Sequence, residues 1–314
     1  PSAVTLGGDG HYTNVRFDSG VPHDLFLTVP ALQNDTTVLA YQRAFVDKVL
    51  AHTLPHDHVL YTVTNELFPQ HPTAWSRHWT SHLRQRAAER GTEVEVTEMF
   101  LAVDVQADQH RASLDHPGRF DYVELSQNAH QTGQTHWEKL QWARGAIADA
   151  PRPINHVKVY GGAVGWTDGA KEGIDRWWRN LIGGAASTRF HRPEEGIGLS
   201  PQARAHLRSA RMLTAEFDLL AARPDAEHRR LSARANNEAY LAAIPDQAYA
   251  VYFPDGGSVR LRLPEPAPEV KVRWLNLSES TWAGSFFRAD TQRLPLKTPG
   301  SGDWVGLVKV IGEG

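Results

Sequence analysis

A carboxylate and an amide stand side by side where a buried strand is expected to end. Residues 58–69 read HVLYTVTNELFP, and the apolar and β-branched residues at its start predict a strand buried on both faces. Asn65 and Glu66 follow this strand directly. A carboxylate at the C-terminal end of a parallel strand is placed for general acid/base catalysis, because that rim holds the active sites of α/β barrels. The structural alternative is a Glu that only pairs with an arginine.

Further polar side chains fall at or just after the ends of other expected strands. They are Asn128, His130, Lys158, Tyr160 and His191. A barrel would gather these residues at one rim, and as hydrogen-bonding groups they suit a polyhydroxylated ligand. Each of them alone is more often structural than functional.

The acidic and histidine residues do not predict a metal centre. The motif H-E-x-x-H is absent, and the group around Asp57, between His56 and His58, lies at the start of its strand and hence at the wrong end of a barrel. No metal ligands and no cofactor are therefore expected.

Composition excludes several classes of function. The chain has 314 residues, a formal net charge of −3 and 41% hydrophobic residues, so it can bury a large core. It contains no basic stripe of the kind that binds nucleic acid and no apolar run of ~20 residues that would cross a membrane. The absence of cysteine excludes disulfides and thiolate chemistry and is compatible with either cytoplasm or periplasm.

Alternating strand and helix patterns predict an α/β fold in the first two thirds of the chain. Helices are expected at 37–54, 72–91, 135–149, 170–182 and 200–220. Strands are expected near 59–65, 94–99, 121–127, 155–160 and 187–190. This alternation is typical of parallel βα units, and we predict a barrel-like domain over residues 1–222.

The pattern changes to short strands and turns from about Pro224. Residues 248–253, the turn Asp255-Gly256-Gly257 and residues 259–263 read as a hairpin. Further strands are expected at 270–275, 293–296 and 304–310. We predict a small antiparallel β-sandwich over residues 223–314.

The barrel predicted in this way is incomplete. A full (β/α)8 barrel needs roughly 250 residues, and only about 220 precede the β-domain. Residues 1–37 read as a long loop with at most a hairpin, so too little chain precedes the strand at 59–65 for three βα units. The chain is expected to lack the first strands of a longer protein, whose N-terminal segment would be its partner.

Several segments resemble a bacterial family of glycoside hydrolases. The segments are YQRAFVDKVL, the Asn-Glu strand and WRNLIGGAASTRFHRP, followed by AVYFPDGG, VRWLNL and TPGSGDWV. The resemblance covers most of residues 34–314 and implies a (β/α)8 barrel of the large retaining clan, followed by a collagen-binding-type β-domain. It implies a carbohydrate substrate but does not fix which sugar.

The resemblance also implies roles for the residues at the strand ends. Glycoside hydrolysis needs two carboxyls, one to protonate the leaving oxygen and one to attack or to activate water. Glu66 is the implied acid/base, and Asn65 would bind the sugar 2-hydroxyl unless it serves as a cap. Glu98 lies near the end of the adjacent strand, ~4.8 Å away, and is the candidate second carboxyl. Glu124 lies deeper in its strand and reads as a buried partner of an Arg or Lys.

One departure from the family leaves the function open. In the clan the nucleophile is a Glu at the end of the seventh strand, whereas the matching residues 154–160 contain no carboxylate, and Lys158 stands there instead. Two hypotheses follow. The first is a glycosidase that uses Glu66 and a second rim carboxyl. The second is a non-catalytic carbohydrate-binding barrel that has lost its nucleophile.

Overall fold

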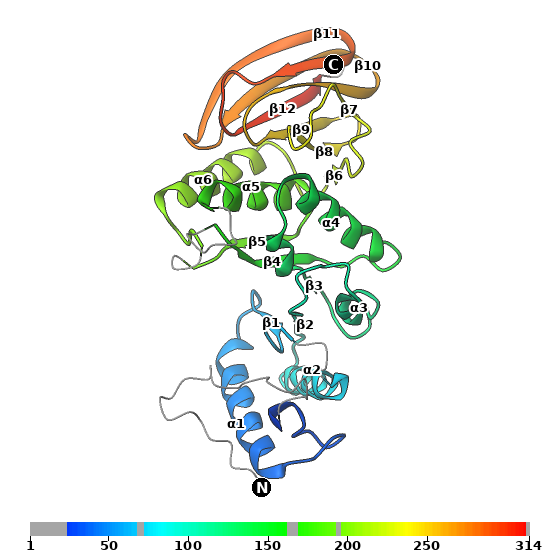
Figure 1. Cartoon of the computed structure of the whole chain (residues 1–314), viewed down its shortest axis with the longest axis vertical. Helices are drawn as coiled ribbons and strands as arrows, with labels where there is room; N and C mark the ends of the chain where they lie inside the picture. The colour runs from blue at the N-terminus through cyan, green and yellow to red at the C-terminus, as the bar shows by residue number, and fades with distance from the viewer. Residues whose placement is uncertain (1–23, 68–71, 162–168, 193–195, 312–314) are drawn as a thin grey trace. The chain divides into compact units, whose positions relative to one another are not determined.

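The computed structural model describes residues 24–67, 72–161, 169–192 and 196–311 (Figure 1). The chain divides into two compact units. The first consists of Pro1–Ala102 and His116–Tyr122, and the second of Val103–Asp115 and Val123–Gly314. The expected loop and hairpin over residues 1–37 lie largely outside the described residues.

The first unit contains two helices and a pair of parallel strands. Its elements in order are the 3-10 helix η2 (Asp24–Phe26), α1 (Thr36–Thr53), β1 (Leu60–Thr62), α2 (Thr73–Ala88) and β2 (Glu95–Thr97). Asp35 caps α1 by accepting hydrogen bonds from the backbone N–H groups of Thr37 and Val38. Tyr61 of β1 lies opposite Val96 of β2, and both belong to one apolar cluster with residues of α1 and α2. The parallel direction of this strand pair was predicted from the sequence.

The second unit begins with strands that alternate with helices. They are α3 (Asp108–Leu114), β3 (Val123–Glu124), the 3-10 helix η3 (Ser126–His130), α4 (Gly133–Ala146), β4 (Ile154–Val159), α5 (Gly169–Ile182), β5 (Ser187–Phe190) and α6 (Pro201–Thr214). The strands form a parallel sheet in the order β3-β4-β5, as predicted.

Two local expectations in this unit were wrong. Helix α3 occupies a stretch for which we expected neither a helix nor a strand. The strand expected over residues 121–127 is extended only at Val123–Glu124, because Glu124 Oε1 accepts hydrogen bonds from the backbone N–H and the hydroxyl of Ser126. These local bonds close a turn, and the chain continues as η3 instead of as a strand.

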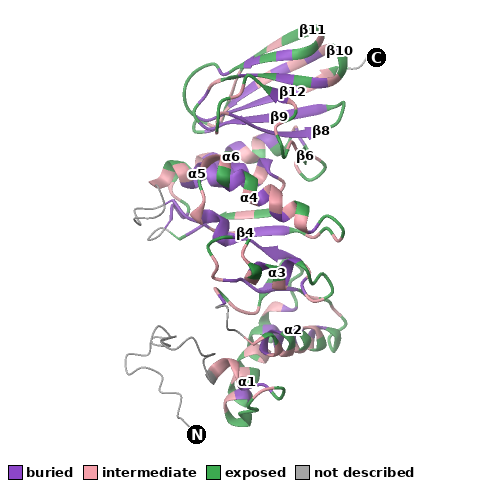
Figure 2. Cartoon of the chain, turned by 45° about the vertical axis from the view of Figure 1, so that its right-hand side comes forward, coloured by how far each residue is buried: buried purple, intermediate pink, exposed green. Residues whose placement is uncertain are grey.

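The remaining strands form one large antiparallel sheet. Its strands are β6 (Arg223–Pro224), β7 (Leu231–Ser232), β8 (Tyr240–Ile244), β9 (Ala248–Phe253), β10 (Ser258–Asn276), β11 (Thr281–Lys297) and β12 (Trp304–Ile311). They are arranged in the order β11-β10-β12-β9-β8-β6, and β7 pairs with β10. Figure 2 shows how far the central strands of this sheet are buried.

The predicted hairpin at residues 248–263 is wrong. Strand β9 pairs with β8 and β12, whereas β10 pairs with β7, β11 and β12. The segments 259–263 and 270–275, expected as separate strands, are the two ends of one long strand whose register against β11 shifts between Arg262 and Ala267. Side chains from both ends of β10, such as Leu261 and Val272, share one apolar cluster. The sheet therefore encloses this core by bending at the register shift.

Helix α5 is buried between the parallel sheet and the large antiparallel sheet (Figure 1). Ile174, Trp177 and Trp178 are at most 3% exposed and share a cluster with side chains of both sheets. The Trp178 indole stacks on Tyr252 of β9 at 5.8 Å between ring centroids and donates a hydrogen bond of 3.0 Å to His206 of α6. Removing this ring would leave a cavity in the middle of the unit.

We expect Trp178→Ala to lower the free energy of unfolding by about 3–5 kcal/mol, because burial and the stacking contact are both lost. Trp178→Phe keeps an aromatic ring in place and should lose less. Chemical denaturation followed by circular dichroism measures both. Leu220→Ala is the control, because Leu220 is 84% exposed and its truncation should change stability by less than about 0.5 kcal/mol. Equal losses for the alanine variants at 178 and 220 would contradict the packing.

Candidate active site

Glu66 lies at an interruption of the pairing between the two parallel strands of the first unit. Backbone hydrogen bonds join Val63 to Thr97 and, further along, Leu67 to Met99, so pairing resumes beyond the intervening residues. Glu66 itself has a φ of 55°, in the left-handed region that is unfavourable for a residue with a Cβ. Asn65 is exposed and Glu66 half-buried. This left-handed position coincides with the interruption of the strand pairing.

Glu98 lies immediately after β2 and is directed at helix α2. Its carboxyl is 2% exposed and accepts a hydrogen bond from the Ser76 hydroxyl. Burial raises the pKa of Glu98 to about 7, although the Ser76 hydrogen bond and the charge of Arg119 oppose that rise. In this conformation Glu98 is part of the contact between strand and helix, and burial favours its protonated form.

In the second unit, Glu124 is the centre of a buried polar group. It is 1% exposed, accepts hydrogen bonds from Ser126, and accepts one of 2.8 Å from the amide of Asn155. Burial raises its pKa to about 7, with the Ser126 hydrogen bonds and the charge of Lys158 acting in the opposite direction. The hydrogen-bond partners shown for Glu124 are thus Ser126 and Asn155, and the expected pairing with an Arg or Lys stays a prediction.

The other predicted site residues belong to the second unit. Asn128 is fully buried and donates a hydrogen bond of 3.0 Å to the backbone carbonyl of His136 on α4. His130 is the last residue of η3. Tyr160 and His191 come together at the ends of β4 and β5, with ring centroids 4.5 Å apart. The structure therefore places Asn65, Glu66 and Glu98 in one unit and the remaining five residues in the other.

The sequence reading missed a buried cationic cluster on α5. Arg176 and Arg179 are both fully buried. Arg179 pairs with Glu172, and Arg176 donates a hydrogen bond of 2.8 Å to the carbonyl of Gln131. Burial, followed by the charge of Arg179, holds the pKa of His136 well below its usual value, so this imidazole is neutral. Two arginines that interrupt the apolar side of a helix were the signal available in the sequence.

A histidine pair with i, i+4 spacing was also overlooked. His78 and His82 stack on α2, and His82 Nε2 lies 2.9 Å from a carboxylate oxygen of Asp47. Within the described residues, no group of three or more potential ligands is arranged to hold a metal ion. In the same part of the chain, no helix has the length and apolar character needed to cross a membrane.

Comparison with solved structures identifies glycoside hydrolases of similar fold. A glycoside hydrolase of family 5 from Bacteroides vulgatus is 11% identical and aligns over 83% of this chain and 64% of that chain, with a TM-score of 0.59. Another glycoside hydrolase is 10% identical over 82% of this chain and 65% of that chain, with a TM-score of 0.55. The chain thus spans slightly less than two thirds of each. No protein-family model matches the sequence, and no curated protein is significantly similar to it.

These similarities show that the chain shares the fold of glycoside hydrolases. At such low identity they say nothing about individual residues. The mixed α/β class expected from the sequence is confirmed, together with a large antiparallel sheet.

The raised pKa of Glu98 predicts a pH-dependent stability. Its folded-state pKa of about 7 exceeds the ordinary 4.5. The stability that the neutral carboxyl contributes is therefore fully present below about pH 4.5, and it is lost as the pH rises from there through about 7. Glu98→Gln keeps an oxygen for Ser76 but cannot ionise. We expect this variant to gain stability relative to the wild type between pH 5 and 8, by up to roughly 3 kcal/mol.

Urea denaturation at several pH values measures this difference. Glu95→Gln is the matched control, because Glu95 begins β2, three residues before Glu98, and is exposed. A constant difference between wild type and Glu98→Gln from pH 5 to 8 would show that Glu98 does not titrate in that range.

Proposed function

We propose that this protein is a glycoside hydrolase acting on an oligo- or polysaccharide. The observation that carries the proposal is Glu66, which has a left-handed backbone at the interruption of a parallel strand pair, in a chain with a glycoside-hydrolase fold. In the proposal, the parallel strands belong to a (β/α)8 barrel over residues 1–222, and residues 223–314 form a β-sandwich-like domain.

Glu66 is the proposed acid/base. Protonation of the glycosidic oxygen by Glu66 would let a poor leaving group depart, and Asn65, exposed beside it, would bind a sugar hydroxyl. In the proposal, Asn128, His130, Lys158, Tyr160 and His191 contribute to substrate binding.

Glu98 is the proposed second carboxyl, and its environment sets a condition on that role. A nucleophile or base has to be ionised, whereas burial favours the protonated form of Glu98. To act on a sugar, the side chain would leave Ser76, turn from α2 toward the ends of the strands and lose its proton there. If Glu98→Gln leaves turnover unchanged, Glu98 is structural.

We expect Glu66→Gln to lower glycoside turnover by ~10²–10⁴-fold with little change in ligand affinity, because glutamine keeps the shape but cannot donate a proton. Substrates with an activated aryl leaving group need less protonation and should lose less. Steady-state kinetics on an alkyl and an aryl glycoside, in a form of the protein with measurable turnover, tests this. Glu95→Gln is the exposed control. Equal losses on both substrates would remove Glu66 from the role of acid, and binding without any wild-type turnover would favour the non-catalytic barrel.

We further propose that additional βα units cover one face of the first unit. Among the described residues, β1 pairs only with β2. Beside it, α1 exposes Tyr41, Phe45 and Val49, which are 76%, 70% and 38% exposed and repeat every four residues. An apolar stripe of this kind marks a contact surface, and more than a third of each of the two glycoside hydrolases compared above has no counterpart in this chain.

This proposal predicts self-association of residues 1–314. We expect the isolated chain to form dimers or larger species through the stripe and to show little or no activity. Phe45→Glu should shift it toward the monomer in sedimentation velocity, because a charge is then placed in the contact. Leu220→Glu, at an 84% exposed position of the second unit, should leave the distribution unchanged. A monomeric, fully active chain would refute the proposal.

A further inference from the structure

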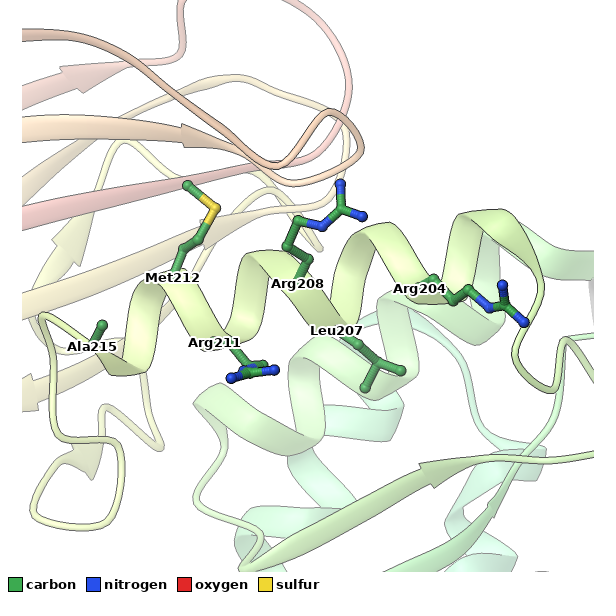
Figure 3. Close-up of a pocket in the computed structure, with 6 residues that line it drawn as sticks. All are labelled: Arg204, Leu207, Arg208, Arg211, Met212 and Ala215. Atoms are coloured by element: carbon green, nitrogen blue, oxygen red, sulfur yellow. The ribbon is translucent and has the colours of Figure 1, made fainter.

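Helix α6 carries a row of arginines along a groove. Arg204, Arg208 and Arg211 are exposed and follow each other at i, i+4 and i+7, which places them along one side of the helix over ~10 Å. Together with Leu207, Met212 and Ala215 they line a shallow, largely open surface groove of about 520 Å³, to which only α6 and the residue after it contribute (Figure 3).

The charge of this row is uncompensated within the described part of the chain. None of the three arginines forms an ion pair there with a described carboxylate. Glu216, which follows the helix, is already paired with Arg273 and Lys309. Glu279 lies in the turn whose Ser280 contacts the carbonyl of Ala205, and it too forms no ion pair with the row. Like charges at i, i+4 repel each other, and a bound anion would relieve that repulsion.

The groove is apolar as well as basic. Leu207 and Met212 are half-buried and pack against the cluster that surrounds α5, so the bottom of the groove is held in place. Guanidinium groups bind carboxylates through paired hydrogen bonds. A sugar that bears a carboxylate offers both surfaces, since its C–H face is apolar and its acid group is anionic.

We propose that the α6 groove binds an anionic polysaccharide whose sugars carry carboxylates. The choice of a polysaccharide over other polyanions rests on the proposed glycosidase function. The binding itself does not depend on Glu66 or on hydrolysis, because all six residues that line the groove lie on or beside α6. A negatively charged chain would bridge the three arginines and screen their repulsion.

The experiment is a calorimetric titration of residues 1–314 with oligogalacturonate at low salt. We expect binding that weakens with added salt, and a loss of ~10-fold or more in Arg204→Gln/Arg208→Gln/Arg211→Gln, because three charge-assisted contacts are removed. The control is Arg260→Gln/Arg262→Gln/Arg293→Gln, three exposed arginines on β10 and β11. It makes the same change in net charge and should bind like the wild type.

Three outcomes would overturn the inference. They are equal loss in both triple variants, equal binding of a neutral oligogalactoside, and equal binding of a DNA duplex of matched charge, which would indicate a general polyanion surface. A sulfated oligosaccharide is compared in the same assay, and weaker binding of it assigns the groove to carboxylates. Glu66→Gln should bind oligogalacturonate like the wild type. If a form of the protein that includes the proposed additional βα units binds oligogalacturonate but hydrolyses no glycoside, the glycosidase function is rejected and the binding at α6 is retained.

Discussion

The burial of α5 between two sheets is the constraint on which the second unit depends. A helix covered on both sides must approach its neighbours closely and satisfy every polar group it buries. Close approach is achieved at Gly173, where a Cβ would lie 2.6 Å from both Gly161 Cα and the carbonyl oxygen of Tyr160. Only glycine fits there, so the contact between α5 and the end of β4 is fixed by the absence of a side chain.

The buried polar groups of α5 are satisfied by separate partners. Toward the large sheet, Asp175 accepts a hydrogen bond of 2.7 Å from the Tyr252 hydroxyl and pairs with Lys171 at 2.7 Å. Arg179, whose guanidinium lies over the ring of Tyr240 in β8, pairs with Glu172, and Arg176 donates a hydrogen bond to the Gln131 carbonyl. Removing one partner of a buried ion pair leaves an uncompensated charge. These groups therefore specify the position of the helix more than they add to the stability of the fold. The ends of β4 and β5, where Tyr160 and His191 meet, are thereby held against a rigid layer.

The three glutamates near strand ends differ in environment, and this difference separates their chemistry. Glu98 and Glu124 are buried, so burial raises the pKa of each to about 7. Glu66 is half-buried and lies where the ladder is interrupted. Of the three, Glu66 is the one that a substrate would reach without rearrangement of a helix, which supports its proposed role.

The sequence by itself determined the order and direction of the βα elements, because each depends on local periodicity. The parallel pairs around β1 and β4 and the change to an all-β region were readable from residue patterns. The interruption at Asn65-Glu66 was visible in part, since the apolar run stops there. That the backbone at Glu66 is left-handed was not visible, because a glutamate in a strand-like run carries no local signal for a positive φ.

Tertiary structure alone decided which strands pair and what each buried polar group contacts. The Asp255-Gly256-Gly257 turn is a good local signal for a hairpin, yet β10 pairs with β7, β11 and β12 because its apolar faces are buried there. Likewise, nothing near Glu98 in the sequence indicates Ser76, and nothing near Asp175 indicates Tyr252, since these partners are distant along the chain. Local propensity sets the elements, whereas burial of apolar area and of charge selects among the pairings that those elements allow.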